Sequence, residues 1–325
     1  MTSFVIELGP RIAALKAVVV RKPRAPAIAG QTVVVAEDFG FVNTSSLVVA
    51  RSATGILPER VAFAASGPGK RASQKFLTDH VSGDDVEILE RVQLSGRKFL
   101  DRIQAQAARI DQLRSEIDLG YARLGRLKAE INLLAGRDPG DRVPLELEAV
   151  SASNSEQHRH LAMHGRFFRL LGGLSQLKAV RRAVYRSVAG LKKSWFGHVS
   201  NIRMALAMKY RAVVASEGLS ILAVEKKDPA YKGRTFNKMI NNGAKGQYTR
   251  RADDKLDWRG IARIALPSYY TSSTDWRNGT VDKSQRKGQW FTAADGARWD
   301  ADMHAAEMLA RWLFLGPRPA EQSAL

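Results

Sequence analysis

The chain has 325 residues, 45% of them hydrophobic, which suffices for one good core, or for one core with an insertion. With 51 Lys and Arg against 32 Asp and Glu, its formal net charge is +19, so we expect a polyanionic partner such as nucleic acid. It contains no cysteine, which excludes disulfides, cysteine-ligated zinc and thiol catalysis.

Nothing in the sequence is typical of a membrane or secreted protein. Lys or Arg interrupts every apolar run well before the roughly 18 residues that a membrane span needs. Glu7 and Arg11 break the apolar stretch at the N-terminus, so it lacks a signal-peptide pattern. We therefore expect a cytoplasmic protein without a membrane partner.

Short runs rich in β-branched residues predict strands in the first part of the chain. These runs cover residues 3–8, 16–21, 31–36, 46–51 and 60–66. The third and fourth runs flank a turn at 40–45, so we expect them to pair as a hairpin.

Residues 84–135 carry the clearest helical pattern. Apolar residues recur at the heptad spacing of a coiled-coil seam. One series is Ile103, Ile110, Ile117, Leu124 and Ile131, and its companion is Phe99, Leu113, Leu127 and Leu134, with Gln106 and Gly120 interrupting the second. After the break G-R-D-P-G-D, residues 156–216 again read as largely helical, so an intramolecular helical hairpin is favoured over a dimeric zipper.

The second helical region is strongly basic. Between Gln157 and Ser216 there is no Asp or Glu but there are twelve Lys or Arg. Basic runs are usually solvated faces, but sixty residues without an acid favour a track for a phosphate backbone. Its candidate contacts are Lys178, Arg181, Arg182, Arg186, Lys192 and Lys193. The interleaved aromatic residues fit core positions better than base-stacking positions.

Residues from 229 onward suggest a small basic insertion followed by a last helix. The stretch up to residue 251 is rich in Gly, Asn and Lys, which suits a nucleic-acid-binding loop. Residues 263–267 predict a strand, and 302–315 an amphipathic helix. Arg277 is a candidate phosphate clamp, because a guanidinium can bind two phosphate oxygens at once. Arg250 and Arg251 are weaker candidates for the same role. An equally good interpretation is that these arginines only contribute surface charge.

Three acidic residues stand where a carboxylate is unusual. Asp38 and Glu225 each end an apolar, strand-like run, and Asp302 opens the last helix. A buried carboxylate is costly unless something pairs with it, and oxygen ligands suit magnesium or manganese. Two such ions can activate a water and stabilise the leaving oxygen in phosphodiester hydrolysis. Alternatively, Asp38 is a turn residue, Glu225 pairs with a neighbouring lysine, and Asp302 is an ordinary helix-opening acid.

The ordered set of motifs resembles the RuvC-type nuclease domain of type V CRISPR effectors and related transposon-encoded RNA-guided DNA nucleases. The matching segments are Asp38-Phe39-Gly40 after a strand, I-L-A-V-E ending at Glu225, L-P-S-Y-Y-T-S-S-T, and D-M-H-A-A from Asp302. The resemblance implies an α/β fold with an RNase H-like mixed sheet, Mg2+ or Mn2+ held by the three acids, and a guide RNA and target DNA as partners.

The chain departs from that family in three places. His304 stands where the third motif has asparagine, and the four-cysteine zinc ribbon is absent, so no zinc is expected. Only 37 residues precede Asp38, so the recognition lobe of the family would come from a second protein or a second copy. The chain would then be a compact or split effector.

The resemblance sets the expected domain organisation. It comprises N-terminal strands at 1–28 as a remnant of a wedge domain, RuvC parts at 29–84, 217–228 and 299–325, a helical insertion at 85–216 that is basic from 157, and a Nuc-like insertion at 229–298 that includes the strand at 263–267. The predicted function is an RNA-guided, Mg-dependent DNA endonuclease. The alternatives are a catalytically inactive nucleic-acid-binding module of the same family and a coiled-coil scaffold.

Overall fold

The computed structural model describes residues 27–40, 42–58, 61, 86–146, 153–218, 245–266, 270–277 and 280–314, and the backbone of 2–8 and 13–19. The chain divides into two compact units, Met1–Lys98 with Ser194–Leu325, and Phe99–Lys193. No helix of the described residues is long and apolar enough to cross a membrane. The strand expected at 60–66 lies, but for Val61, outside the described residues.

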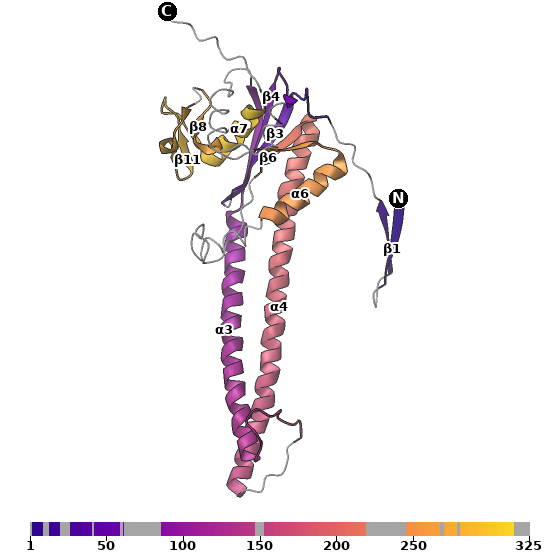
Figure 1. Cartoon of the computed structure of the whole chain (residues 1–325), viewed down its shortest axis with the longest axis vertical. Helices are drawn as coiled ribbons and strands as arrows, with labels where there is room; N and C mark the ends of the chain where they lie inside the picture. Colours follow the sequence, from indigo (N-terminus) through magenta and orange to yellow (C-terminus); the bar gives the residue numbers. More distant parts are fainter. Residues whose placement is uncertain are drawn as a thin grey trace, which may run out of the picture. The chain divides into compact units, whose positions relative to one another are not determined.

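The first unit contains a mixed five-stranded sheet (Figure 1). Its strands are β3 (Val33–Asp38), β4 (Asn43–Ser52), β5 (Val86–Ser95), β6 (Val213–Glu217) and β7 (Arg263–Leu266), in the order β5-β4-β3-β6-β7. The first three form an antiparallel meander, whereas β6 runs parallel to β3 and β7 runs parallel to β6. The hairpin predicted from 31–36 and 46–51, and the strand at 263–267, are confirmed.

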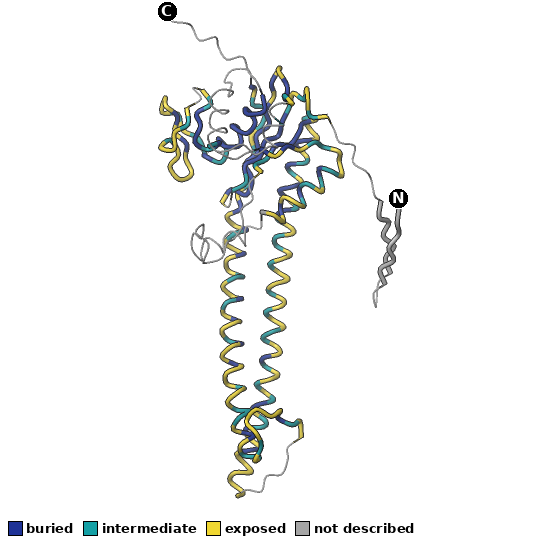
Figure 2. The backbone as a smooth tube through the Cα atoms, in the orientation of Figure 1, coloured by how far each residue is buried: buried dark blue, intermediate teal, exposed yellow. Residues whose placement is uncertain are grey.

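Helices cover both faces of this sheet. On one face, Val34 and Ala36 of β3 share a core with α7 (Ala301–Leu313). On the other face, Val35 shares a core with the last turns of α4 (Asn154–Tyr210) and with α6 (Lys245–Arg259). Successive strand residues point to opposite faces, so both faces of β3 can be apolar. Figure 2 shows β3 and β4 buried along nearly their whole length.

Two segments expected to be helical are strands. The helix predicted over 84–135 begins only at Arg97, because 86–95 forms β5. The helix predicted over 156–216 ends at Tyr210, and β6 follows at 213–217. Both segments are short, and they gain backbone partners only from strands distant in sequence, so the neighbouring helical pattern concealed them.

A small β insertion precedes α7. It contains η1 (Thr271–Ser273), β8 (Thr274–Asp275), β9 (Thr280–Val281), η2 (Lys283–Gln285), β10 (Arg286–Lys287), β11 (Trp290–Thr292) and β12 (Arg298–Asp300). The buried His304 of α7 stacks on Phe291 with ring centroids 3.7 Å apart, and its Nε2 lies 2.8 Å from the Thr274 carbonyl oxygen. The residue that departs from the motif therefore anchors the insertion to α7.

The second unit pairs α3 (Arg97–Leu134) with the first part of α4. The predicted seam is confirmed, because its residues Ile103, Ile110 and Ile117 are buried. Between the helices, Arg114 Nη2 donates to Tyr185 Oη at 2.9 Å. The two helices run side by side in Figure 1, so the seam closes within one chain, as the helical-hairpin interpretation expected.

The remaining described element is a hairpin of β1 (Thr2–Leu8) and β2 (Ala13–Val19), antiparallel from Thr2 opposite Val19 to Leu8 opposite Ala13. Strands were expected at 3–8 and 16–21, so both are confirmed, the second beginning three residues earlier than predicted.

Two glycines of the helical pair should respond oppositely to alanine. A Cβ on Gly172 would meet nothing within 4 Å, whereas one on Gly120 would lie 2.5 Å from Leu174 Cδ2. Gly172→Ala should raise the free energy of unfolding by about 0.5–1 kcal/mol, since glycine disfavours helix. Gly120→Ala should lower the free energy of unfolding by about 1–3 kcal/mol relative to the parent, because the buried Leu174 must move. Urea unfolding of both variants measures the difference, and equal stabilities would contradict this packing.

Candidate active site

Asp38 is the last residue of β3 and is 8% exposed. It follows Val34 and Ala36 at the two-residue spacing of a strand, and both of those side chains belong to the core shared with α7. Asp38 therefore lies on the α7 face, at the point where the strand ends.

Glu217 ends the strand beside β3. The last recorded pair between β3 and β6 joins Glu37 to Ser216, so Asp38 and Glu217 are the next two residues along these parallel strands. Glu217 alternates with Val213 and Ala215, which lie in the core against α7. Thr271 Oγ1 of η1 donates to Glu217 Oε1 at 3.4 Å. Asp38 and Glu217 thus share one face and one end of the sheet.

Asp302 reaches the same region from the first turn of α7. The side chain of Asp300 caps this helix by accepting from the backbone N–H groups of Asp302 and Met303. Asn43 Nδ2 at the start of β4 donates to Asp302 Oδ2 at 3.1 Å, and Arg286 Nη2 lies 3.5 Å from Asp302 Oδ1. The cap role of Asp300 leaves Asp302 as the acid directed toward β3 and β4.

The surroundings of Asp302 raise the pKa of its carboxyl group, with burial as the largest cause. Burial raises the pKa of its carboxyl group, and the nearby charge of Asp300 adds to that effect. The hydrogen bond from Asn43 and the positive charge of Arg286 act in the opposite direction. A cationic or hydrogen-bonding partner therefore favours the ionised form of this partly buried carboxylate.

Gly40 explains the spacing of the Asp-x-Gly motif. A Cβ at Gly40 would lie 2.6 Å from the Asn43 carbonyl oxygen and 3.4 Å from Asp302 Oδ2. A contact under 3.0 Å with backbone cannot be relieved by rotating a side chain. Only glycine lets the chain after Asp38 turn this tightly beside Asp302.

The sequence prediction named Glu225 as the second acid, and Glu225 lies outside the described residues. Glu217 was missed, although the run A-V-V-A-S-E that it ends carries the required signal of an apolar, β-branched segment closed by an acid. The helix predicted over 156–216 covers most of this run. Its place beside β3 became visible only through strand pairing.

The donor chemistry of this region fits a hard divalent cation, because carboxylate oxygens are the ligands that magnesium and manganese prefer. β3, β6 and the first turn of α7 place Asp38, Glu217 and Asp302 at the same end of the sheet. Their side chains are nevertheless not gathered: within the described ranges, no three His, Cys, Asp or Glu side chains form a group that could hold a metal ion.

The candidate nucleic-acid contacts are distributed over two helices. Arg182, Arg186 and Lys193 are exposed on α4, while Lys178, Arg181 and Lys192 are partly buried. Lys178 Nζ lies 4.7 Å from the centre of the Tyr121 ring. On α6, Arg250 is exposed and Arg251 is partly buried.

Arg277, the other candidate, is part of an aromatic cluster. Its guanidinium carbon lies 5.2 Å from the centre of the Trp276 ring and 4.3 Å from that of Trp299, and Nη1 is 3.5 Å from Asp295 Oδ1. These contacts fit a packing role within the insertion. The arginine that lies beside a candidate carboxylate is Arg286 on β10, which the sequence prediction had not singled out.

Comparisons with known proteins found matches among solved structures only. No protein-family model matches the chain, and no curated protein sequence is significantly similar to it. Among solved structures, CasPhi-2 (Cas12j) bound to crRNA and phosphorothioate DNA is 14% identical and has a TM-score of 0.44, covering 89% of this chain and 46% of that one. A Cas12i(E894A)–crRNA–dsDNA complex is 14% identical with a TM-score of 0.46, covering 89% and 32%.

A third structure, the mini-RNA-guided endonuclease CRISPR-Cas phi3, is 13% identical with a TM-score of 0.41, covering 89% of this chain and 46% of that one. The chain thus spans less than half the length of these three proteins. Such TM-scores do not by themselves establish a common fold, so the functional argument depends on the residues.

Gly40→Ala should disturb both the fold and the carboxylate region, because the added methyl group displaces the Asn43 backbone beside Asp302. We expect a loss of about 1–3 kcal/mol in the free energy of unfolding. Gly246→Ala on α6 is the matched control, since a Cβ there meets nothing within 4 Å. Urea unfolding compares the two variants, and a Gly40→Ala protein as stable as the control would contradict the close approach.

Proposed function

We propose that this chain is the catalytic part of an RNA-guided, magnesium-dependent DNA endonuclease in which Asp38, Glu217 and Asp302 hold the metal. The observation that carries the proposal is the placement of three acids, which lie 85 to 264 residues apart in the sequence, at one end of one sheet face. The strand order and directions are compatible with the RNase H-like sheet that the motifs predict.

Divalent cations bound there would supply a more acidic attacking water and charge stabilisation for the leaving oxygen. The residues of the chain would orient the reactants. Asn43 and Thr271 would hold the carboxylates of Asp302 and Glu217 through the hydrogen bonds that they already make. Arg286 would exchange its contact with Asp302 for a phosphate oxygen of the substrate, which is also an anionic partner.

The basic part of α4 would bind the nucleic-acid backbone. No acid in the 60 residues from Gln157 to Ser216 opposes its positive charge. Arg182 and Arg186 are exposed on the same helix and stand four residues apart, so they lie on one face. Guide RNA is the proposed ligand of this face, and target DNA is the proposed substrate. A second protein, or a second copy of the chain, would supply target recognition.

One observation favours a second function, that of a nucleic-acid-binding module without catalysis. The two oxygens of Asp302 contact Asn43 and Arg286, and the described acids form no ligand group. A protein that had lost its metal would retain such internal pairing.

The isosteric variants Asp38→Asn, Glu217→Gln and Asp302→Asn should each abolish magnesium-dependent cleavage, by 100-fold or more, because each removes a charged ligand. Glu225→Gln is the discriminating control and should keep activity close to that of the parent. The measurement is cleavage of labelled target DNA by the full chain with guide RNA, with and without Mg2+. Loss of activity only in Glu225→Gln would restore that residue as the ligand, and an inactive parent would favour the binding module.

Reversing charge on α4 should weaken nucleic-acid binding through lost counterion release. The double variant Arg182→Glu, Arg186→Glu should reduce the magnitude of the negative slope of log K against log salt concentration by about 2, one for each lost phosphate contact. Arg123→Glu with Arg126→Glu on α3 is the matched control, because these arginines are equally exposed. Fluorescence anisotropy with labelled RNA at several salt concentrations measures the slopes. Equal slopes for the two double variants would rule out α4 as the specific binding face.

A further inference from the structure

Tyr248 of α6 contacts both residues that flank Asp38. Its hydroxyl donates to Glu37 Oε1, and its ring stacks on Phe39 with centroids 5.2 Å apart and planes 24° apart. Glu37 and Phe39 are the two chain neighbours of Asp38, and Tyr248 is 2% exposed. One buried side chain therefore contacts the side chains on either side of a candidate metal ligand.

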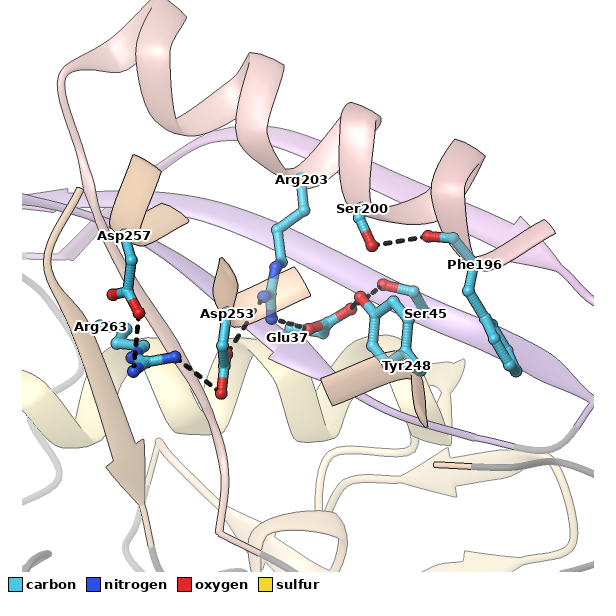
Figure 3. A network of polar contacts seen from close by, with 9 residues as sticks. All are labelled: Glu37, Ser45, Phe196, Ser200, Arg203, Tyr248, Asp253, Asp257 and Arg263. Carbon is cyan, nitrogen blue, oxygen red and sulfur yellow. Dashed lines mark hydrogen bonds and ion pairs between the residues drawn. The ribbon is translucent and has the colours of Figure 1, made fainter. Parts of the chain in front are cut away.

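The contact is made from the face of the sheet opposite to the carboxylates. Glu37 alternates with Asp38, so its side chain points toward α4 and α6 while Asp38 lies on the α7 face. Figure 3 shows Glu37 between Arg203 and Tyr248. Arg203 Nη1 donates to Glu37 Oε2 at 2.5 Å, and Ser45 Oγ donates to Oε1 at 2.5 Å. The carboxylate is thus held by donors from three separate elements.

The charges within this cluster are compensated. Burial alone would lower the pKa of Arg203, but the surrounding groups, Glu37 foremost and Asp253 among them, together outweigh it and raise that pKa, so the guanidinium stays charged. Burial raises the pKa of Tyr248 well above its usual value, which keeps its hydroxyl protonated as a donor. Arg203 Nη2 also lies 3.7 Å from Asp253 Oδ1 on α6. Because a buried pair is costly to break, the cluster fixes Glu37 strongly.

The end of β3 needs such an external support. The strand ends at Asp38, and Phe39 and Gly40 lie beyond it. Before Asp38, strand pairing fixes the chain relative to Glu217. After Asp38, the contacts of Phe39 fix it. A metal ligand must be held within about 0.5 Å of its productive position, and supporting contacts generally provide this.

We propose that Tyr248 is a positioning residue for Asp38: its hydroxyl and its ring fix Glu37 and Phe39 from the far face, and so preset the carboxylate for metal binding. The inference rests on the proposed function, in which Asp38 is a metal ligand. It assigns to α6 a role in the reaction although α6 covers the face of the sheet opposite to the carboxylates.

The test uses the full chain with Tyr248→Phe, which keeps the ring stack and removes the hydroxyl, and with Phe39→Leu, which removes the stack. Glu37→Gln is avoided as the main variant, because it leaves Arg203 buried beside a neutral partner. Tyr210→Phe is the matched control, since its hydroxyl likewise donates to a glutamate, Glu90 Oε2, at 2.8 Å. Two readouts are taken: the Mn2+ dissociation constant by electron paramagnetic resonance, and hydrogen exchange of the peptide covering 33–42.

Tyr248→Phe and Phe39→Leu should each weaken Mn2+ binding by about tenfold and speed exchange at the end of β3, while Tyr210→Phe stays within about twofold of the parent. Unchanged Mn2+ affinity and exchange in Tyr248→Phe would overturn the inference, as would an equal loss of affinity in Tyr210→Phe. A parent chain that binds no Mn2+ would overturn the proposed function, and with it the metal-binding part of the inference. Exchange would still decide whether Tyr248 holds the end of β3.

Discussion

Two consecutive acids at the end of one buried strand govern the architecture of the first unit. Glu37 and Asp38 point to opposite faces of the sheet, and both are nearly or fully buried. A buried carboxylate is tolerated only with hydrogen-bond or charge partners. On one side, Ser45, Arg203 and Tyr248 satisfy Glu37. Arg203 belongs to α4 and Tyr248 to α6, so these contacts hold both helices against that face of the sheet.

The two faces of the sheet therefore differ in their polar groups and in the role that these groups suit. The face of α4 and α6 joins an apolar core to a compensated ionic cluster, which suits a scaffold. On the face covered by α7, an apolar core lies beside the acids at the ends of β3 and β6. There Asn43 and Arg286 contact Asp302, and Thr271 contacts Glu217. Preorganised polar groups beside a packed core are the usual setting of chemistry in a fold. The carboxylates therefore stand on rigid elements rather than on loops.

The helix that stabilises the sheet also carries much of the positive charge. Near its C-terminal end, α4 contributes Leu206 and Ala207 to the core and Arg203 to the ionic cluster. Along its earlier turns it carries exposed arginines and pairs with α3 through an apolar seam. Because a phosphate backbone is attracted by charge density rather than by one side chain, a helix with no acid after Glu156 suits such a ligand. In the proposed function, the helix that binds nucleic acid thus also supports the sheet that carries two of the acids.

The sequence by itself determined those features that local patterns encode. Heptad spacing predicted the seam of Ile103, Ile110 and Ile117, and β-branched runs predicted β3, β4 and β7, since side-chain periodicity reports burial directly. Motif spacing selected Asp38 and Asp302. Only the tertiary structure decided that 86–95 and 213–217 are strands, that Glu217 lies next to Asp38, and that Arg286 contacts Asp302. Strand neighbours and buried ion pairs join residues far apart in the chain, and such partners leave no periodic signal in the sequence around either one.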